Sequence, residues 1–246
     1  MGLFENLYRK EIKIFLESLH EAKSLVVSLD PDLIEILLLS IKINLISLAM
    51  ACIIGLPAGS ALAVLRFPTR KIVIATCSAL MSLPPVVVGL IVYLYLSRNG
   101  PLGWLELLYT PAAMIIAQVI LITPIIITLS CQIIEDLQED YREYFSSLVI
   151  SHQKAIFAYI YDARYSLITV VLAGFGRAIS EVGAVIIVGG NIDHLTRVMT
   201  TTISLETSKG NLPLALALGI ILLIISLSVN FTAAFFKNFA KRNAYV

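Results

Sequence analysis

The sequence predicts an all-α, polytopic integral membrane protein with about five transmembrane helices and an amphipathic N-terminal helix. Of its 246 residues, 58% are apolar and only 14% are charged, whereas soluble domains carry about 25% charged residues. The apolar residues lie in long blocks, because Asp, Glu, Lys and Arg are absent from residues 43–65, 72–97, 107–134 and 210–236. Each block has the ~20 apolar residues that a helix needs to cross a bilayer.

The first segment, residues 1–30, is expected to be an amphipathic arm. Its apolar positions from Ile12 to Leu29 recur at alternating spacings of three and four residues, and charged residues stand between them. This spacing is typical of a helix with one wet face. Such a helix lies at the membrane interface or packs across the outside of a bundle. A short soluble arm is the alternative.

A transmembrane domain is expected over residues 33–239, after the helix breaker Asp30-Pro31-Asp32. Its second span should be broken at Pro84-Pro85, because two prolines remove backbone donors and kink or end a helix. The expected spans are residues 33–65, 72–97, 111–134, 165–188 and 213–236.

Basic residues predict the orientation of these spans. Loop 66–71, loop 135–164 and the C-terminal tail alternate onto one face and hold nine Lys and Arg residues, whereas loops 98–106 and 190–212 hold three. The richer face is expected to be cytoplasmic, which puts the C-terminus in the cytoplasm. The arm, with four basic residues on the other side, goes against this rule. A sixth, non-standard membrane contact by the arm therefore stays open.

Two charged residues, Arg177 and Glu181, are expected at bilayer depth, with Ser180 between them and Gln118 as a polar residue of the preceding span. Residues four apart on a helix share a face and can form an ion pair. An unpaired charge at the centre of a membrane helix costs roughly 2.5–3.5 kcal/mol. The pair either pins helix packing or lies beside a translocation path. We favour the path, because intramembrane charges usually mark one.

Signatures of enzymes are missing from the sequence. It contains no H-E-x-x-H, no G-x-S-x-G and no Walker phosphate loop, and its three histidines lie in different segments. We therefore expect no catalytic residue and no metal site. The net charge of +1 also gives no field strong enough to bind nucleic acid.

Residues 139–164 form the longest polar connector in the middle of the chain. Acidic residues begin it, and apolar residues follow, interrupted by Ser151-His152-Gln153-Lys154. This pattern predicts two short helices with an exposed apolar face at the cytoplasmic surface. Such a face packs against lipid headgroups or against another protein.

Two stretches make the chain resemble a known family. In the connector, Glu143 matches the acid of a Glu-Ala-Ala motif, Tyr144 and Phe145 replace its alanines, Val149 replaces its glycine, and Asp162 stands where its proline should be. The second stretch reads GFGRAISEVGAVIIVGGN over residues 174–191 and continues into residues 196–201. Together they resemble permease subunits of prokaryotic ABC importers, in the molybdate/sulfate-like branch and nearest to tungstate-specific permeases.

The resemblance implies a type I ABC importer permease fold in the cytoplasmic membrane and a homodimer with two ATP-binding cassette subunits. These ATPases would bind ATP and magnesium, and this chain would bind no cofactor. The residues implied to contact the ATPase are Glu143, Tyr144, Phe145, Val149, Ser151, His152 and Asp162. An extracytoplasmic binding protein would deliver the substrate to an outer loop that includes Asn191, Thr196, Arg197 and Thr200.

The implied substrate is a tetrahedral oxyanion, most of all tungstate. A permease of the same fold for molybdate or sulfate is the nearest alternative. An ion-coupled secondary transporter is a further one, but it would more typically show paired broken helices in two internal repeats. Only the span over residues 72–97 is expected to be broken.

Overall fold

The computed structural model describes residues 2–28, 30–140 and 152–244, and all regular secondary structure within these ranges is helical. The all-α expectation is confirmed. The helices are α1 (Gly2–Val27), α2 (Pro31–Val64), α3 (Arg70–Leu80), α4 (Pro85–Leu96), the short 3-10 helix η1 (Gly103–Leu105), α5 (Pro111–Asp140), α7 (His152–Asp162), α8 (Arg164–Ile179), α9 (Gly183–Gly189), α10 (Met199–Ser208) and α11 (Leu212–Ala244).

Three of these helices are long and apolar enough to cross a membrane: α2, the Pro111–Gln138 part of α5 and the Leu212–Phe235 part of α11. Two bent pairs meet the same test. They are α3 with α4, bent by 98°, and Ile156–Asp162 with α8, bent by 83°. Counting each bent pair as one span gives five by length and composition, as the sequence predicts.

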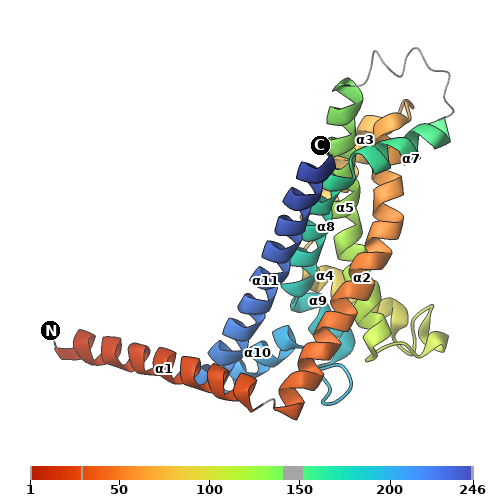
Figure 1. The fold of residues 1–246 in the computed structure, drawn as a ribbon. Helices are drawn as coiled ribbons and strands as arrows, with labels where there is room; N and C mark the ends of the chain where they lie inside the picture. Colours follow the sequence, from red (N-terminus) through yellow and green to blue (C-terminus); the bar gives the residue numbers. More distant parts are fainter. Residues whose placement is uncertain (1, 29, 141–151, 245–246) are drawn as a thin grey trace.

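Apart from α1, the long helices run side by side, and their connections gather at two ends (Figure 1). The end of α2, the helices α3 and α7 and the C-terminus lie at one end, which we call the C-terminal end. The beginnings of α2 and α11, the helix α10 and the loop around η1 lie at the opposite end. Loops that the sequence assigns to one face of the membrane therefore share one end of the bundle.

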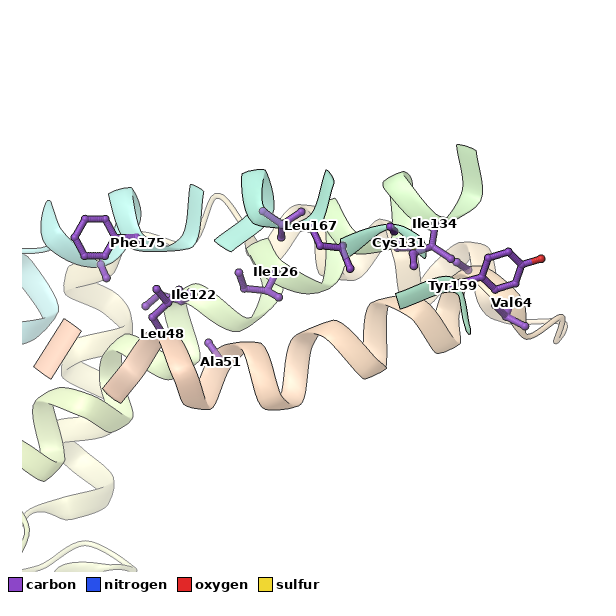
Figure 2. Packing of buried hydrophobic residues seen from close by; sticks show 14 of the residues in the cluster. Leu48, Ala51, Val64, Ile122, Ile126, Cys131, Ile134, Tyr159, Leu167 and Phe175 are labelled. Carbon is purple, nitrogen blue, oxygen red and sulfur yellow. The ribbon is translucent and has the colours of Figure 1, made fainter. Parts of the chain in front are cut away.

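Helices α2 and α5 form the centre of the bundle, because glycines let their backbones come close. A Cβ atom added to Gly55 would lie 2.8 Å from the Ile126 Cβ, and one added to Gly59 would lie 2.5 Å from the Ile127 carbonyl oxygen. Around this contact, buried side chains of α2, α5, α7 and α8 join in one cluster (Figure 2). Labelled members include Leu48, Ile122, Ile126, Ile134, Tyr159, Leu167 and Phe175.

Both ends of α2 are capped by side chains. At its start, Asp30 accepts hydrogen bonds from the backbone N–H groups of Asp32 and Leu33, each 3.0 Å long. At its end, the Arg70 Nε donates to the Leu62 carbonyl oxygen at 2.6 Å, and the same guanidinium pairs with Glu135 of α5. Arg70 thus ties the ends of α2, α3 and α5 together at the C-terminal end.

Candidate intramembrane and surface sites

The expected span over residues 165–188 is wrong as one continuous helix, because α8 ends at Ile179 and α9 begins at Gly183. The cause is local. One carboxylate oxygen of Glu181 accepts a hydrogen bond from the backbone N–H of Ala184 at 2.9 Å. A side chain that binds a nearby backbone group competes with the bonds of a continuous helix. We call residues 180–182 the α8–α9 break.

The expected ion pair forms across this break. The Arg177 Nη1 lies 2.5 Å from the Glu181 Oε2. Glu181 is 3% exposed, and both of its carboxylate oxygens have partners. The Arg177 side chain is 25% exposed, and Ser180 beside it is exposed. A Cβ atom added to Gly176 would meet nothing within 4 Å. This part of the chain therefore presents a polar, open surface between the two ends of the bundle.

Two other helices are hydrogen-bonded to the chain at the end of α8 and in the α8–α9 break, and one of them is bonded in turn to α2. Gln118 of α5 donates to the Ala178 carbonyl oxygen at 3.3 Å and to the Asn44 Oδ1 of α2 at 2.9 Å. Thr200 of α10 donates to the Glu181 carbonyl oxygen at 2.9 Å. Asn44, Gln118, Glu181 and Thr200 also line one small cavity. The break is therefore a meeting point of α2, α5 and α10.

Asn44 was not among the residues singled out from the sequence. It lies in a block of 23 residues without Asp, Glu, Lys or Arg. The one feature of the sequence that could have pointed to Asn44 was its polar carboxamide within this apolar block. Its partner Gln118 is 74 residues away. Sequence spacing could not have predicted that pair.

The expected break at Pro84 and Pro85 is confirmed, since α3 ends at Leu80 and α4 begins at Pro85. Helix α4 packs closely on α9, because a Cβ atom on Gly89 would lie 2.8 Å from the Ala184 Cα. Two half-helices that each follow a break are thus in contact. The expectation of a single broken span is therefore wrong.

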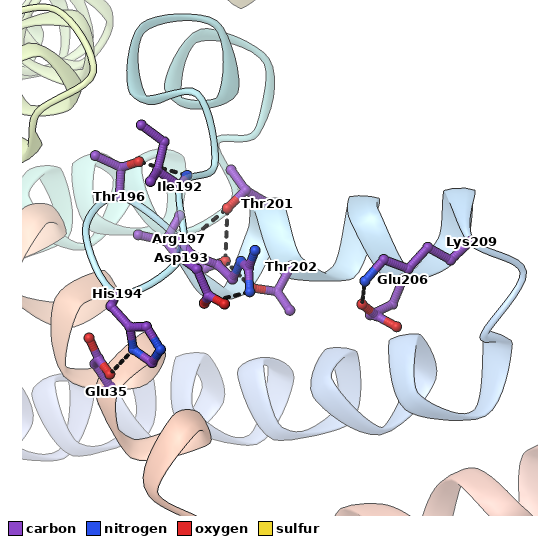
Figure 3. Close-up of polar contacts among 11 residues, drawn as sticks. Glu35, Ile192, Asp193, His194, Thr196, Arg197, Thr201, Thr202, Glu206 and Lys209 are labelled. Carbon is purple, nitrogen blue, oxygen red and sulfur yellow. Dashed lines mark hydrogen bonds and ion pairs between the residues drawn. The ribbon is translucent and has the colours of Figure 1, made fainter.

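Of the expected outer-loop residues, Thr196 and Arg197 lie in the loop between α9 and α10 (Figure 3), whereas Thr200 belongs to α10 and bonds to the α8–α9 break. Thr196 is completely buried, donates to the Gly189 carbonyl oxygen at 2.6 Å and accepts from the Ile192 backbone N–H at 3.0 Å. Its hydroxyl therefore holds the turn after α9. Arg197 pairs with the Asp193 carboxylate at 2.5 Å. Asn191 adopts a left-handed conformation with φ of 51°.

Two further ion pairs lie at this end of the bundle. His194 lies 2.8 Å from a Glu35 carboxylate oxygen and so joins the loop to the first turns of α2 (Figure 3). The hydrogen bond and the negative charge of Glu35 raise the pKa of His194, and the charge of Asp193 adds to this. In α10, Glu206 accepts a hydrogen bond from Lys209 at 2.7 Å, which lowers the pKa of Glu206.

Most of the residues expected to contact an ATPase lie outside the described residues: Glu143, Tyr144, Phe145, Val149 and Ser151. His152 begins α7 and Asp162 ends it, so one of the two expected short helices is present. Its Tyr159 is 3% exposed in the core, whereas Phe157 and Tyr161 are 70% and 67% exposed. Helix α7 therefore shows an aromatic face at the C-terminal end of the bundle.

The aromatic face is held in place by Arg164, the first residue of α8. Its guanidinium lies over the Tyr161 ring at 4.2 Å and over the Tyr165 ring at 4.5 Å. It also donates a hydrogen bond to the Tyr161 carbonyl oxygen at 2.6 Å. These contacts connect α7 to α8 at the 83° bend between them.

Comparison with known proteins shows which family this chain belongs to. Residues 55–242 match the family described as "Binding-protein-dependent transport system inner membrane component". The chain is 39% identical to a protein of Peptoclostridium acidaminophilum named "Tungstate uptake system permease protein TupB", over 87% of this chain and 94% of that one. It is 40% identical to the protein of the same name from Campylobacter jejuni, over 68% and 70% of the two chains.

A "Probable anion ABC transporter permease protein" of Haloferax volcanii is 39% identical over 84% of this chain and 91% of its own length. Sulfate and molybdenum transport system permeases are more distant, at 26% and 25% identity. The expected resemblance to ABC importer permeases and the type I fold it implied are both confirmed. The chain belongs to the family of inner membrane components of binding-protein-dependent transport systems, the permease subunits of ABC importers.

Proposed function

We propose that this chain is the membrane-spanning subunit of an ATP-driven importer for a tetrahedral oxyanion, and that the oxyanion is tungstate. Two relatives that share about two-fifths of their residues with this chain carry tungstate uptake in their names. The sulfate and molybdenum permeases share only about a quarter. Molybdate and sulfate are therefore the alternatives that a transport assay must separate from tungstate.

The observation that carries the proposal is the position of Arg177. Its guanidinium is partly exposed on the outside of a single chain, beside Ser180 and the open space at Gly176. Lipid does not tolerate such a surface without cost. A second copy of the chain, facing the first across this surface, would turn it into a polar path between two subunits.

The charges of this surface suit an anion that must pass through the path without being bound tightly. Arg177 offers a positive group to an oxyanion, while Glu181 keeps the local net charge near zero. Binding in a conduction path must be favourable enough for entry and weak enough for release. Tight and selective binding of the oxyanion then belongs to a separate extracytoplasmic binding protein, which would deliver it at the opposite end, near the loop with Thr196 and Arg197.

The energy would come from two ATP-binding cassette subunits, which bind ATP and magnesium, because the sequence has no phosphate loop of its own. The exposed Phe157 and Tyr161 at the C-terminal end offer these subunits a docking face. The excess of Lys and Arg in the loops of this end supports a cytoplasmic location for it and for the C-terminus.

Reconstitution tests the function directly. The chain is co-expressed with the ATPase and the binding protein of its transport system, placed in liposomes and supplied with ATP inside or outside. Uptake of tungstate, molybdate and sulfate is then measured by mass spectrometry. We expect ATP-dependent uptake of tungstate. Preference for molybdate or sulfate would refute the substrate, and uptake driven by an ion gradient without ATP would refute the transport class.

The docking face is tested by co-purification. Phe157→Asp and Tyr161→Asp should release the ATPase from the membrane complex, because each puts a charge into an apolar contact. Trp104→Asp is the matched control, since Trp104 is 76% exposed and belongs to η1, which lies at the opposite end. Retention of the ATPase by both α7 variants would show that α7 is not the contact.

A further inference from the structure

Helix α1 lies apart from the other helices. It crosses the beginning of α11 at the opposite end and then projects away from the bundle (Figure 1). The contact with α11 is made by a narrow face. Ser18 is completely buried, and Ala22 packs in a cluster with Ala217 and Leu218 of α11. This contact holds α1 at a steep angle to the spans.

A second face of α1 is apolar and uncovered. Phe15, Leu19 and Val26 are spaced by four and seven residues, which places them on one side of a helix. They are 51%, 42% and 53% exposed. A third face is polar and carries the exposed pair of Lys13 and Glu17, whose charged atoms are 3.7 Å apart. The described part of α1 therefore has three faces, directed at protein, apolar surroundings and water.

The surface next to α1 indicates what covers the apolar face. Only 22% of the most apolar window of α11 is buried inside the chain. Its Leu223, Ile224 and Leu227 are 58%, 57% and 47% exposed, as expected for a helix that faces lipid. Because α1 packs on the first turns of α11, its uncovered apolar face lies next to a helix that itself exposes apolar side chains.

We propose that α1 is an interfacial lipid anchor. Phe15, Leu19 and Val26 insert among the acyl chains of the leaflet at the opposite end, and Lys13 and Glu17 face water. Helices with one apolar and one charged face lie in the plane of a membrane surface in this way. The proposal depends only on the chain spanning the membrane, and not on its substrate or its ATPase. With the C-terminal end in the cytoplasm, this leaflet is the outer one.

Tryptophan fluorescence tests this proposal in the full-length chain. Trp104 is the single tryptophan, so W104F gives a silent background. Phe15→Trp then probes the apolar face, and Ser24→Trp is the matched control, because Ser24 is exposed and lies on the opposite side of α1. Each variant is placed in phosphatidylcholine nanodiscs with lipids brominated near the carbonyl end or near the middle of the acyl chains.

We expect the tryptophan at position 15 to be quenched several-fold more strongly by the shallow bromines than by the deep ones, and to be shielded from aqueous iodide. The tryptophan at position 24 should instead be quenched strongly by aqueous iodide and weakly by the lipid bromines. Iodide quenching of both positions would make α1 a water-exposed arm. Shielding of position 15 from bromine and iodide alike would show that protein covers it, such as a second copy of the chain. Either result overturns the proposal.

Discussion

Removing the arginine of the intramembrane pair is the sharpest test of the α8–α9 break. In Arg177→Ala, Glu181 loses the partner 2.5 Å away but stays 3% exposed and bonded to the Ala184 backbone N–H. The carboxylate then stays buried without a counter-charge. This costs free energy, because one half of a buried pair is left alone.

The size of this effect follows from the burial of the two partners. Breaking a fully buried pair costs roughly 3–5 kcal/mol. The Arg177 side chain is 25% exposed, so solvent already weakens the pair and the expected loss of unfolding free energy is about 2–4 kcal/mol. The control is Lys13→Ala, which breaks a pair with the same four-residue spacing but with 78% and 51% exposed side chains. That loss should stay below about 0.5 kcal/mol.

A double variant separates stability from transport. Arg177→Met with Glu181→Gln removes both charges, keeps similar volumes and leaves an acceptor for the Ala184 N–H. Thermal unfolding of the purified protein should show that most of the lost stability returns. Oxyanion uptake should stay low in the single and the double variant, because the path lacks its positive group. Recovery of uptake in the double variant would mean that the pair only pins helix packing.

The remaining predictions concern stability at three other places. Gly59→Ala should cost about 1–3 kcal/mol, because the new methyl would lie 2.5 Å from a carbonyl oxygen of α5; Gly219→Ala, which meets nothing within 4 Å, should leave the melting temperature nearly unchanged or slightly higher. The raised pKa of His194 means that its pair with Glu35 stabilises the fold fully below the unfolded pKa of 6.5 and is lost as the pH rises through the folded pKa. The melting temperature should accordingly fall as the pH rises above about 6.5, and His194→Gln should remove this fall. Arg70→Met should lower the unfolding free energy by about 1–3 kcal/mol, measured by denaturant titration in detergent, and an unchanged midpoint would contradict its role as a cap of α2.

Much of the fold could be predicted because lipid allows few solutions. Apolar blocks longer than a bilayer is thick must be helices, since each backbone polar group needs a partner within its own segment. The break at Pro84 and Pro85 was predictable for the same reason, because two missing donors act whatever surrounds them. The distribution of Lys and Arg also assigned to one face of the membrane the loops that share one end of the bundle in Figure 1.

The α8–α9 break was not predictable in the same way. Residues 180–182 contain no proline, and a helical Arg177–Glu181 pair fits a four-residue spacing just as well. Besides the local bond from the Ala184 N–H to Glu181, tertiary contacts hold the end of α8: Gln118 donates to the Ala178 carbonyl, and Thr200 donates to the Glu181 carbonyl. These partners come from distant segments, and a single sequence carries no record of which segments meet.

The interlocking of α2 with α5 has a consequence for how the protein can change shape. Where Gly55 and Gly59 face α5, no gap is large enough for one methyl group. Sliding or rotating one helix along the other would make the two backbones clash, so the two helices must move together as one rigid unit. Movement during a transport cycle is then left to the segments where the chain is already discontinuous, at the bend between α3 and α4 and at residues 180–182.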